Sequence, residues 1–113
     1  MKIFKELELL GFFEWLAEMH NLRDTDMKPE YLDELPLNDI HLTVCNSMAF
    51  RWFREKYRLG GKPEYFLNDW YCFIINDMKG EDNSRRLFTE FPSYEEAELE
   101  CLKKLIQIVK ERK

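Results

Sequence analysis

The side chains best suited to metal binding or nucleophilic catalysis are widely spread along this chain: His20, His41, Cys45, Cys72 and Cys101. They form no C-x-x-C or H-x-x-x-H pair, and a predicted helix begins between His41 and Cys45. A metal site needs clustered ligands, and a thiol nucleophile needs a histidine beside it. We therefore predict no metal ion. Cys72 falls in a predicted buried strand and Cys101 on a predicted buried helix face, so both are interpreted as structural cysteines.

Other common catalytic patterns do not match the sequence either. The acidic segment 77–83 does not have the ligand order of a calcium loop, and we interpret it as a hairpin loop. The motifs G-x-S-x-G, G-x-x-x-x-G-K-[ST] and G-x-G-x-x-G do not occur. The expectation is a protein that is not an enzyme, with no catalytic residue, no cofactor and no small-molecule ligand.

Basic and aromatic residues interleave in the segment 51–62. Arg51, Arg54 and Arg58 fall mainly on the outer side of a predicted helix, with Trp52 and Phe53 between them. Cations combined with aromatic rings can hold single-stranded nucleic acid. The net charge of −5 and the pI of about 5.1 argue against this role, and the two aromatic residues equally suit a core. A nucleic-acid accessory protein that uses the helix 43–58 remains the alternative hypothesis.

Surplus apolar surface favours protein association as the main function. The predicted helix 3–20 is apolar on more than one side, and both faces of the predicted strand 70–75 are apolar. We predict an interface at Phe12, Phe13, Trp15 and Leu16. The leading hypothesis is a small non-catalytic protein-interaction module that binds a second copy of itself, as a homodimer, or another protein.

Size and composition are typical of one small globular domain. The chain has 113 residues, of which 45% are hydrophobic and 35% charged, and its three cysteines are too few for a disulfide-built domain. Glutamates interrupt the N-terminal apolar segment, so we expect neither a signal peptide nor a membrane span. These features indicate a cytoplasmic protein with reduced thiols.

Hydrophobic periodicity and turn residues predict the order of elements. After the helix 3–20 comes a connector with a short helix over 30–35, and an irregular segment or short strand at 38–41. A second helix over 43–58 is expected to stop at Gly60-Gly61. The strands 70–75 and 85–91 form a hairpin, and 65–67 is a candidate third strand. Ser93 and Glu96 form a capping box that begins the last helix, 94–112.

These elements define an α+β fold. It has N-terminal helices, an antiparallel sheet of two or three strands, and a long C-terminal helix packed on one face of the sheet. We expect a single domain over residues 1–113. Within it, residues 1–42 form a helical N-terminal extension, and residues 43–113 form a helix–hairpin–helix core.

Two sequence stretches carry a resemblance to known proteins. Residues 50–57 (FRWFREKY), followed by an aromatic hairpin, and residues 91–98 (FPSYEEAE), leading into the last helix, resemble short uncharacterised bacterial and prophage-type proteins. The similarity extends over residues 43–110. It implies a bacterial or mobile-element origin, and it implies no activity and no catalytic residue.

Overall fold

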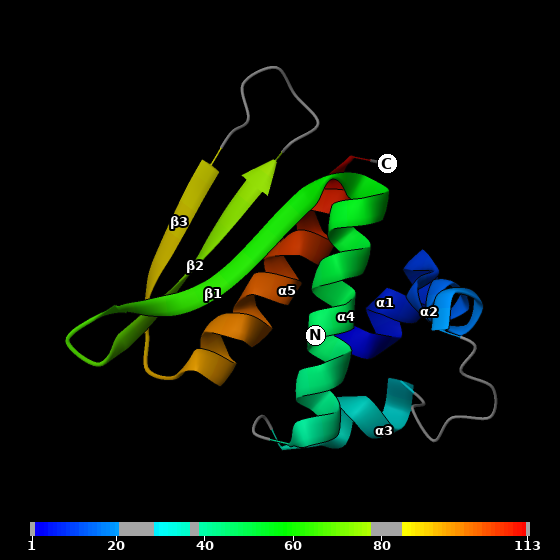
Figure 1. The fold of residues 1–113 in the computed structure, drawn as a ribbon, viewed down its shortest axis with the longest axis horizontal. Helices are drawn as coiled ribbons and strands as arrows, with labels where there is room; N and C mark the ends of the chain where they lie inside the picture. The colour runs from blue at the N-terminus through cyan, green and yellow to red at the C-terminus, as the bar shows by residue number, and fades with distance from the viewer. Residues whose placement is uncertain (1, 21–28, 37–38, 78–84, 113) are drawn as a thin grey trace.

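The computed structural model describes residues 2–20, 29–36, 39–77 and 85–112, and they form the predicted α+β fold (Figure 1). In chain order the elements are α1 (Ile3–Leu10), α2 (Phe12–His20), α3 (Pro29–Glu34), α4 (Ile40–Tyr57), β1 (Leu59–Leu67), β2 (Trp70–Asp77), β3 (Arg85–Phe91) and α5 (Tyr94–Glu111).

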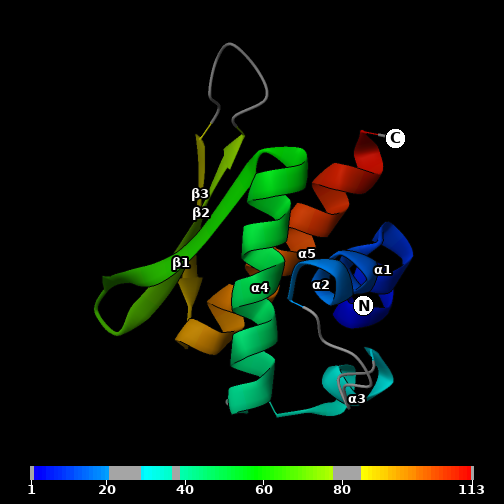
Figure 2. The ribbon, with the colours of Figure 1, turned by 45° about the vertical axis from the view of Figure 1, so that its right-hand side comes forward.

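The sheet is an antiparallel meander in the order β1-β2-β3, which resolves the choice between two and three strands. Helix α5 packs mainly against β1 and β2, and α4 also contacts β1. Figure 2 views the sheet nearly edge-on and shows all the helices on one side of it. The other side of the sheet therefore carries none of the described helices.

The turn from α4 into β1 differs from the prediction. We expected Gly60-Gly61 to stop the helix, but both glycines lie inside β1, and Arg58 adopts the left-handed conformation with φ 55°. Gly61 has a different reason to be glycine. A Cβ atom at this position would lie 2.8 Å from Cys101 Sγ and 2.9 Å from Leu105 Cδ1. The missing side chain lets β1 approach α5 closely.

The predicted helix 3–20 is wrong as a single element, because Gly11 divides it into α1 and α2. Gly11 has φ 96°, a left-handed conformation that glycine adopts at little cost, and its N–H donates to the carbonyl of Glu8 at 3.0 Å. The change in direction lets both helices face one core. Helix α1 buries Leu7, and α2 buries Phe12 and Leu16.

Helix α4 begins at Ile40, so the irregular segment or strand predicted at 38–41 is also wrong where the structure describes it. The N–H of Thr43 already donates to the carbonyl of Asp39 at 3.0 Å. Thr43 is inside the helix, and its Oγ1 donates to the same carbonyl at 3.1 Å. Ser47 Oγ donates to the carbonyl of Thr43 in the same way. Such bonds let short polar side chains occupy helical positions.

The other end of the chain follows the prediction closely. Helix α5 begins after Ser93, whose Oγ accepts a hydrogen bond from the N–H of Glu96 at 3.2 Å. Its buried stripe includes Ala97, Cys101 and Leu105.

A β-bulge in β3 precedes this helix: Thr89 and Glu90 together oppose Cys72, and Glu90 has φ 75°. The bulge lets Phe88 and Phe91 both contact Phe73.

The N-terminal helices and the rest of the chain share one hydrophobic core. The rings of Phe12 in α2 and Trp52 in α4 have centroids 5.6 Å apart, and both side chains are fully buried. The same cluster contains Leu7 of α1 and Leu105 of α5. An ion pair between Lys110 and Glu6 also joins α5 to α1. Helices α1 and α2 thus complete the core on which the sheet rests.

Candidate functional site

The side of the sheet that faces away from the helices is the most distinctive surface of the molecule. Side chains alternate along a strand, and Phe73 and Ile75 of β2 belong to the core, so Cys72 and Ile74 face outward. Cross-strand pairing places further residues on this side. We call it the open face, and it comprises Lys62, Glu64, Phe66 and Leu67 of β1, Trp70, Cys72 and Ile74 of β2, and Leu87 of β3.

The open face is apolar and partly exposed. Its large side chains retain between 40% and 54% of their accessible surface: Phe66 40%, Trp70 43%, Leu67 47% and Leu87 54%. Isolated exposed apolar residues are ordinary, but a contiguous group marks an interaction surface. Leu67 and Trp70 are paired across β1 and β2, and Ile74 and Leu87 are paired across β2 and β3. The exposed apolar residues therefore form two cross-strand pairs on the same side of the sheet, with Cys72 between them along β2.

Two charged residues of the open face lie on β1. Lys62 Nζ is 3.9 Å from Glu64 Oε2, and Glu64 is opposite Cys72. Burial raises the pKa of the Cys72 thiol, and the negative charge of Glu64 raises it further. This thiol is therefore held in its protonated form, which is a poor nucleophile.

The other two thiols lie in the core. Burial raises the pKa of Cys45 to about 11, and it also raises the pKa of Cys101. All three cysteines are buried thiols, in agreement with the buried positions predicted for Cys72 and Cys101. Within the described residues, no three histidine, cysteine, aspartate or glutamate side chains gather as a metal site would require. Most of the predicted loop 77–83, and the side chains of His20 and His41, lie outside what the structure describes.

The predicted interface on the first helix needs correction. Phe12 is 0% exposed and Leu16 is 4% exposed, so neither offers a surface to a partner. Phe13 and Trp15 are partly buried and pack against the core. The ring centroids of Phe12 and Trp15 are 6.1 Å apart. Helix α2 is apolar on several sides because it packs against both α1 and α4. Its own aromatic rings also pack against one another.

The three arginines of the alternative hypothesis are all exposed, but they do not form one site. Arg51 Nε donates to Glu55 Oε1 at 3.0 Å on the surface of α4. Arg58 lies in the turn after the helix. Arg54 instead lines an open hollow of about 430 Å³ with Lys62 and Asn76. The hollow thus brings Arg54 of α4 near Lys62, which belongs to the open face.

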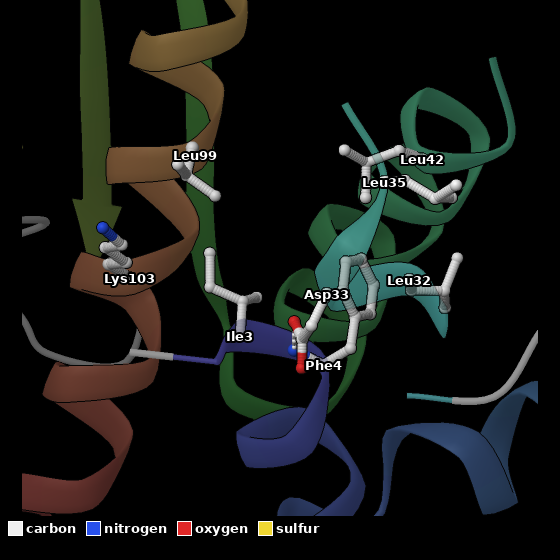
Figure 3. A pocket seen from close by; sticks show the side chains of 8 residues that line it. All are labelled: Ile3, Phe4, Leu32, Asp33, Leu35, Leu42, Leu99 and Lys103. Atoms are coloured by element: carbon white, nitrogen blue, oxygen red, sulfur yellow. Dashed lines mark hydrogen bonds between the residues drawn. The ribbon is translucent and has the colours of Figure 1, made fainter. Parts of the chain in front are cut away.

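A small cavity of about 150 Å³ lies between the N-terminal helices and α5 (Figure 3). Most of its lining is apolar, with Asp33 and Lys103 as its charged residues. The carboxylate of Asp33 accepts hydrogen bonds from the N–H groups of Phe4 at 2.9 Å and Lys5 at 3.2 Å. Lys103 Nζ is 3.1 Å from Glu100 Oε1. Both charged groups are thus engaged within the protein, and we interpret the cavity as a packing gap.

The residues of the open face were only partly anticipated. Strand alternation predicts a second apolar face around Trp70, and this face exists. Phe66, Leu67 and Leu87 were not identified as site residues, because their place depends on the register with β2. Register in such a meander depends on the geometry of the turns and on irregularities such as the shift between Tyr65 and Leu67, which the residue types do not reveal.

Comparisons with known proteins are uninformative for this chain: no protein-family model, no curated protein and no solved structure matches it. None of the described helices combines the length and apolarity that crossing a membrane requires. The resemblance to prophage-type proteins therefore stays a prediction. The site's own geometry is the basis for a functional proposal.

Proposed function

We propose that this protein is a non-catalytic protein-interaction module that self-associates through the open face. The observation that carries the proposal is the exposed group of Phe66, Leu67, Trp70 and Leu87 on a sheet face that no described helix covers. Burying such a group removes apolar surface from water, which is the main driving force for association. Sheets commonly pack face to face in this way.

The charges on the open face favour a second copy of the same chain as the partner. Lys62 and Glu64 lie on one side of the same strand, two residues apart. When two identical faces meet in an antiparallel arrangement, each lysine can approach the glutamate of the other copy. A two-fold interface is self-complementary in this sense. A partner face with only apolar residues would cover the Lys62–Glu64 pair without offering either charge a further counterpart.

The area of the open face determines how strongly two copies are expected to associate. Strands of seven to nine residues spaced about 4.8 Å apart give a face of roughly 400 Å² per copy. Stable interfaces bury about 800 Å² per partner, so this face lies at the weak end of the range. We therefore expect a concentration-dependent dimer rather than a permanent one.

Light scattering after size exclusion at two concentrations tests the proposal. We expect the average mass to rise above 13.9 kDa at the higher concentration. Leu67→Ser should weaken association at least tenfold, because it places a hydroxyl in the apolar group. Leu9→Ser is the matched control, since Leu9 is a 79% exposed leucine on α1. A wild-type protein that stays monomeric, or equal effects of the two variants, would contradict the proposal.

The hollow beside Arg54 and Lys62 supports nucleic-acid binding as a second candidate function. It sets two cations at one end of a face that also carries exposed aromatic rings, and such a combination suits a single strand. The test is fluorescence anisotropy with labelled single-stranded DNA and RNA at low salt. Binding that falls steeply with salt, and that Arg54→Glu and Lys62→Glu both weaken, would support this candidate. No binding at low salt would remove it.

A further inference from the structure

The hollow beside Arg54 and Lys62 is centred on a residue without a side chain, Gly60. It lies where the end of α4 meets the start of β1 (Figure 1). Gly60 and Asn76 are cross-strand partners, and a Cβ atom added to Gly60 would lie 3.7 Å from the Cβ atom of Asn76. Because both residues line the hollow, any larger residue at position 60 would partly fill it. Its volume of about 430 Å³ is within the usual range for small-molecule sites.

Three elements supply hydrogen-bond donors to the hollow. Arg54 comes from α4, Lys62 from β1 and Asn76 from β2, and all three side chains are exposed. Among the residues that the structure describes, no carboxylate belongs to the lining. Asp77, the acidic residue of β2, pairs with Arg112 instead. The hollow therefore combines two cations and an amide without an acidic residue.

The two cations are only weakly neutralised by the protein. Within the described part of the chain, Arg54 makes no ion pair, whereas Arg51 on the same helix is paired with Glu55. Lys62 Nζ is 3.9 Å from Glu64 Oε2, which is beyond hydrogen-bond distance, and the Lys62 side chain is 75% exposed. The hollow is thus a local centre of positive charge on a chain whose net charge is −5.

A phosphate monoester matches these groups in charge and in hydrogen bonding. At neutral pH it carries nearly two negative charges and has three acceptor oxygens. The planar guanidinium of Arg54 can bind two of these oxygens, and the ammonium of Lys62 binds as a compact charge. A carboxylate or a phosphodiester carries a single charge, so it would neutralise only one of the two cations.

We propose that the hollow over Gly60 binds a terminal phosphate group, in the form of a phosphate monoester, through Arg54, Lys62 and the side-chain amide of Asn76. Small phosphorylated molecules and the phosphorylated ends of nucleic acids share this group. Binding here does not rest on self-association, because the Leu67–Trp70 pair lies at the other end of the β1–β2 ladder. It also differs from binding along a nucleic-acid strand, where the phosphates are diesters.

Titration of the Leu67→Ser variant with methyl phosphate at low salt tests the site without interference from dimers. We expect the N–H resonances of Gly60 and the side-chain amide of Asn76 to shift and to saturate in NMR spectra. Arg54→Gln and Lys62→Gln should each raise the dissociation constant about tenfold, the effect of losing one hydrogen bond to a charged group. Arg51→Gln is the matched control. It removes the same charge from α4 outside the hollow, so we expect a change of less than about threefold.

A steric variant separates a built site from a general effect of charge. Gly60→Leu places an apolar side chain in the hollow and removes no cation, so it should abolish the binding of methyl phosphate. Circular dichroism checks that each variant keeps its fold. The proposal would be overturned by the absence of saturable shifts, by equal weakening in Arg51→Gln and Arg54→Gln, or by a folded Gly60→Leu variant that binds normally.

Two further pairs of probes test the chemical class and its source. Dimethyl phosphate should bind about tenfold more weakly than methyl phosphate, because it carries one charge less; equal binding would contradict a monoester site. An oligonucleotide with a 5′-phosphate is compared with the same oligonucleotide with a 5′-hydroxyl. Tighter binding of the phosphorylated form than of methyl phosphate would support a nucleic-acid end as the source, and tighter binding of methyl phosphate would support a small molecule. Equal binding of the two oligonucleotides, without saturation by methyl phosphate, would overturn the proposal in favour of binding along the strand.

Discussion

Gly61 is a residue at which β1 lies close to α5, and it offers a sharp test of the packing. The side chains that an added Cβ would meet, Cys101 and Leu105, are both 0% exposed and cannot move aside. We expect Gly61→Ala to lower the free energy of unfolding by about 1–3 kcal/mol, as overpacking does. Gly60→Ala is the control, since the nearest atom to its added Cβ lies 3.7 Å away. Urea denaturation measures both, and a near-neutral Gly61→Ala would contradict the close approach.

A second residue-scale prediction concerns Glu98, a 4% exposed carboxyl group between α5 and α4. Asn46 Nδ2 donates to Glu98 Oε1 at 2.7 Å. Burial raises the pKa of Glu98 above its ordinary 4.5, and although the Asn46 hydrogen bond lowers the pKa, burial has the larger effect. The folded state therefore binds more protons than the unfolded state between these two pKa values. Stability from this group is present at low pH and is lost as pH rises from 4.5 through the folded pKa.

Glu98→Gln should consequently be more stable than the wild type at pH 7. The amide oxygen can still accept from Asn46, while the charge that burial disfavours is gone. The difference should vanish below about pH 4, where both side chains are neutral. Thermal unfolding over pH 3–8 measures this, with Glu14→Gln, at an exposed position of α2, as control. If the difference in stability between Glu98→Gln and the wild type did not change with pH, burial would not be destabilising the charged form of Glu98.

At the residue scale, sequence reasoning worked where a local rule acts alone. Ser93 caps α5 as predicted, since capping depends on residues three positions apart. It failed at Gly60-Gly61, where a rule for helix ends suggested a stop. The reason for Gly61 is a contact with α5, about 40 residues further along the chain, and no local pattern contains that information.

At the element scale, α3 serves to hold α1. The carboxylate of Asp33 accepts from the first amides of α1, and Lys5 pairs with Glu30 at 2.8 Å. We expect Asp33→Ala to cost about 0.5–2 kcal/mol, the usual range for losing a helix N-cap. Glu34→Ala, at an exposed position of α3, is the matched control. Amide hydrogen exchange should show faster exchange at Phe4 and Lys5 in Asp33→Ala; unchanged exchange there would argue against the cap.

The elements also show why apolar periodicity misplaced the interface. A helix that is apolar on several sides can face a partner or several parts of its own fold. Here Gly11 turns the chain, and α2 contacts α4 and α1 within the same molecule. Gly11 signals a weak point in the helix, but neither the new direction nor the packing partner follows from the sequence. By contrast, strand alternation at residues 70–75 predicts two apolar faces, because the period of two is independent of tertiary context.

At the scale of the whole molecule, the α+β class and the order of the elements could be predicted, and the uncovered side of the sheet could be located only from the structure. The sequence shows that two faces of β2 are apolar. Which face the helices cover depends on how β1 packs against α4 and α5, including the close approach at Gly61. The candidate surface is thus a property of the assembled layers rather than of any one segment.

The three tryptophans lie in different elements and can be observed separately: Trp15 in α2, Trp52 in α4 and Trp70 in β2. In protein labelled with fluorotryptophan, we expect the fluorine resonance of Trp70 to shift as protein concentration rises, because the open face becomes buried. The resonance of Trp52, which is 0% exposed, should not shift. Assignment comes from single Trp→Phe variants. A concentration-independent Trp70 resonance would argue against association through this face.

The same three resonances test whether the N-terminal helices belong to one cooperative unit. The Phe12 and Trp52 rings join α2 to α4, and the Lys110–Glu6 pair joins α5 to α1. Because these contacts link elements that are far apart in the chain, all three native resonances should disappear with one urea midpoint. If instead Trp15 lost its native signal at lower urea than Trp52 and Trp70, residues 1–42 would be a separately unfolding extension. The shared core would then contribute less to stability than its burial implies. The interface predicted at Phe12, Phe13, Trp15 and Leu16 would become a candidate again.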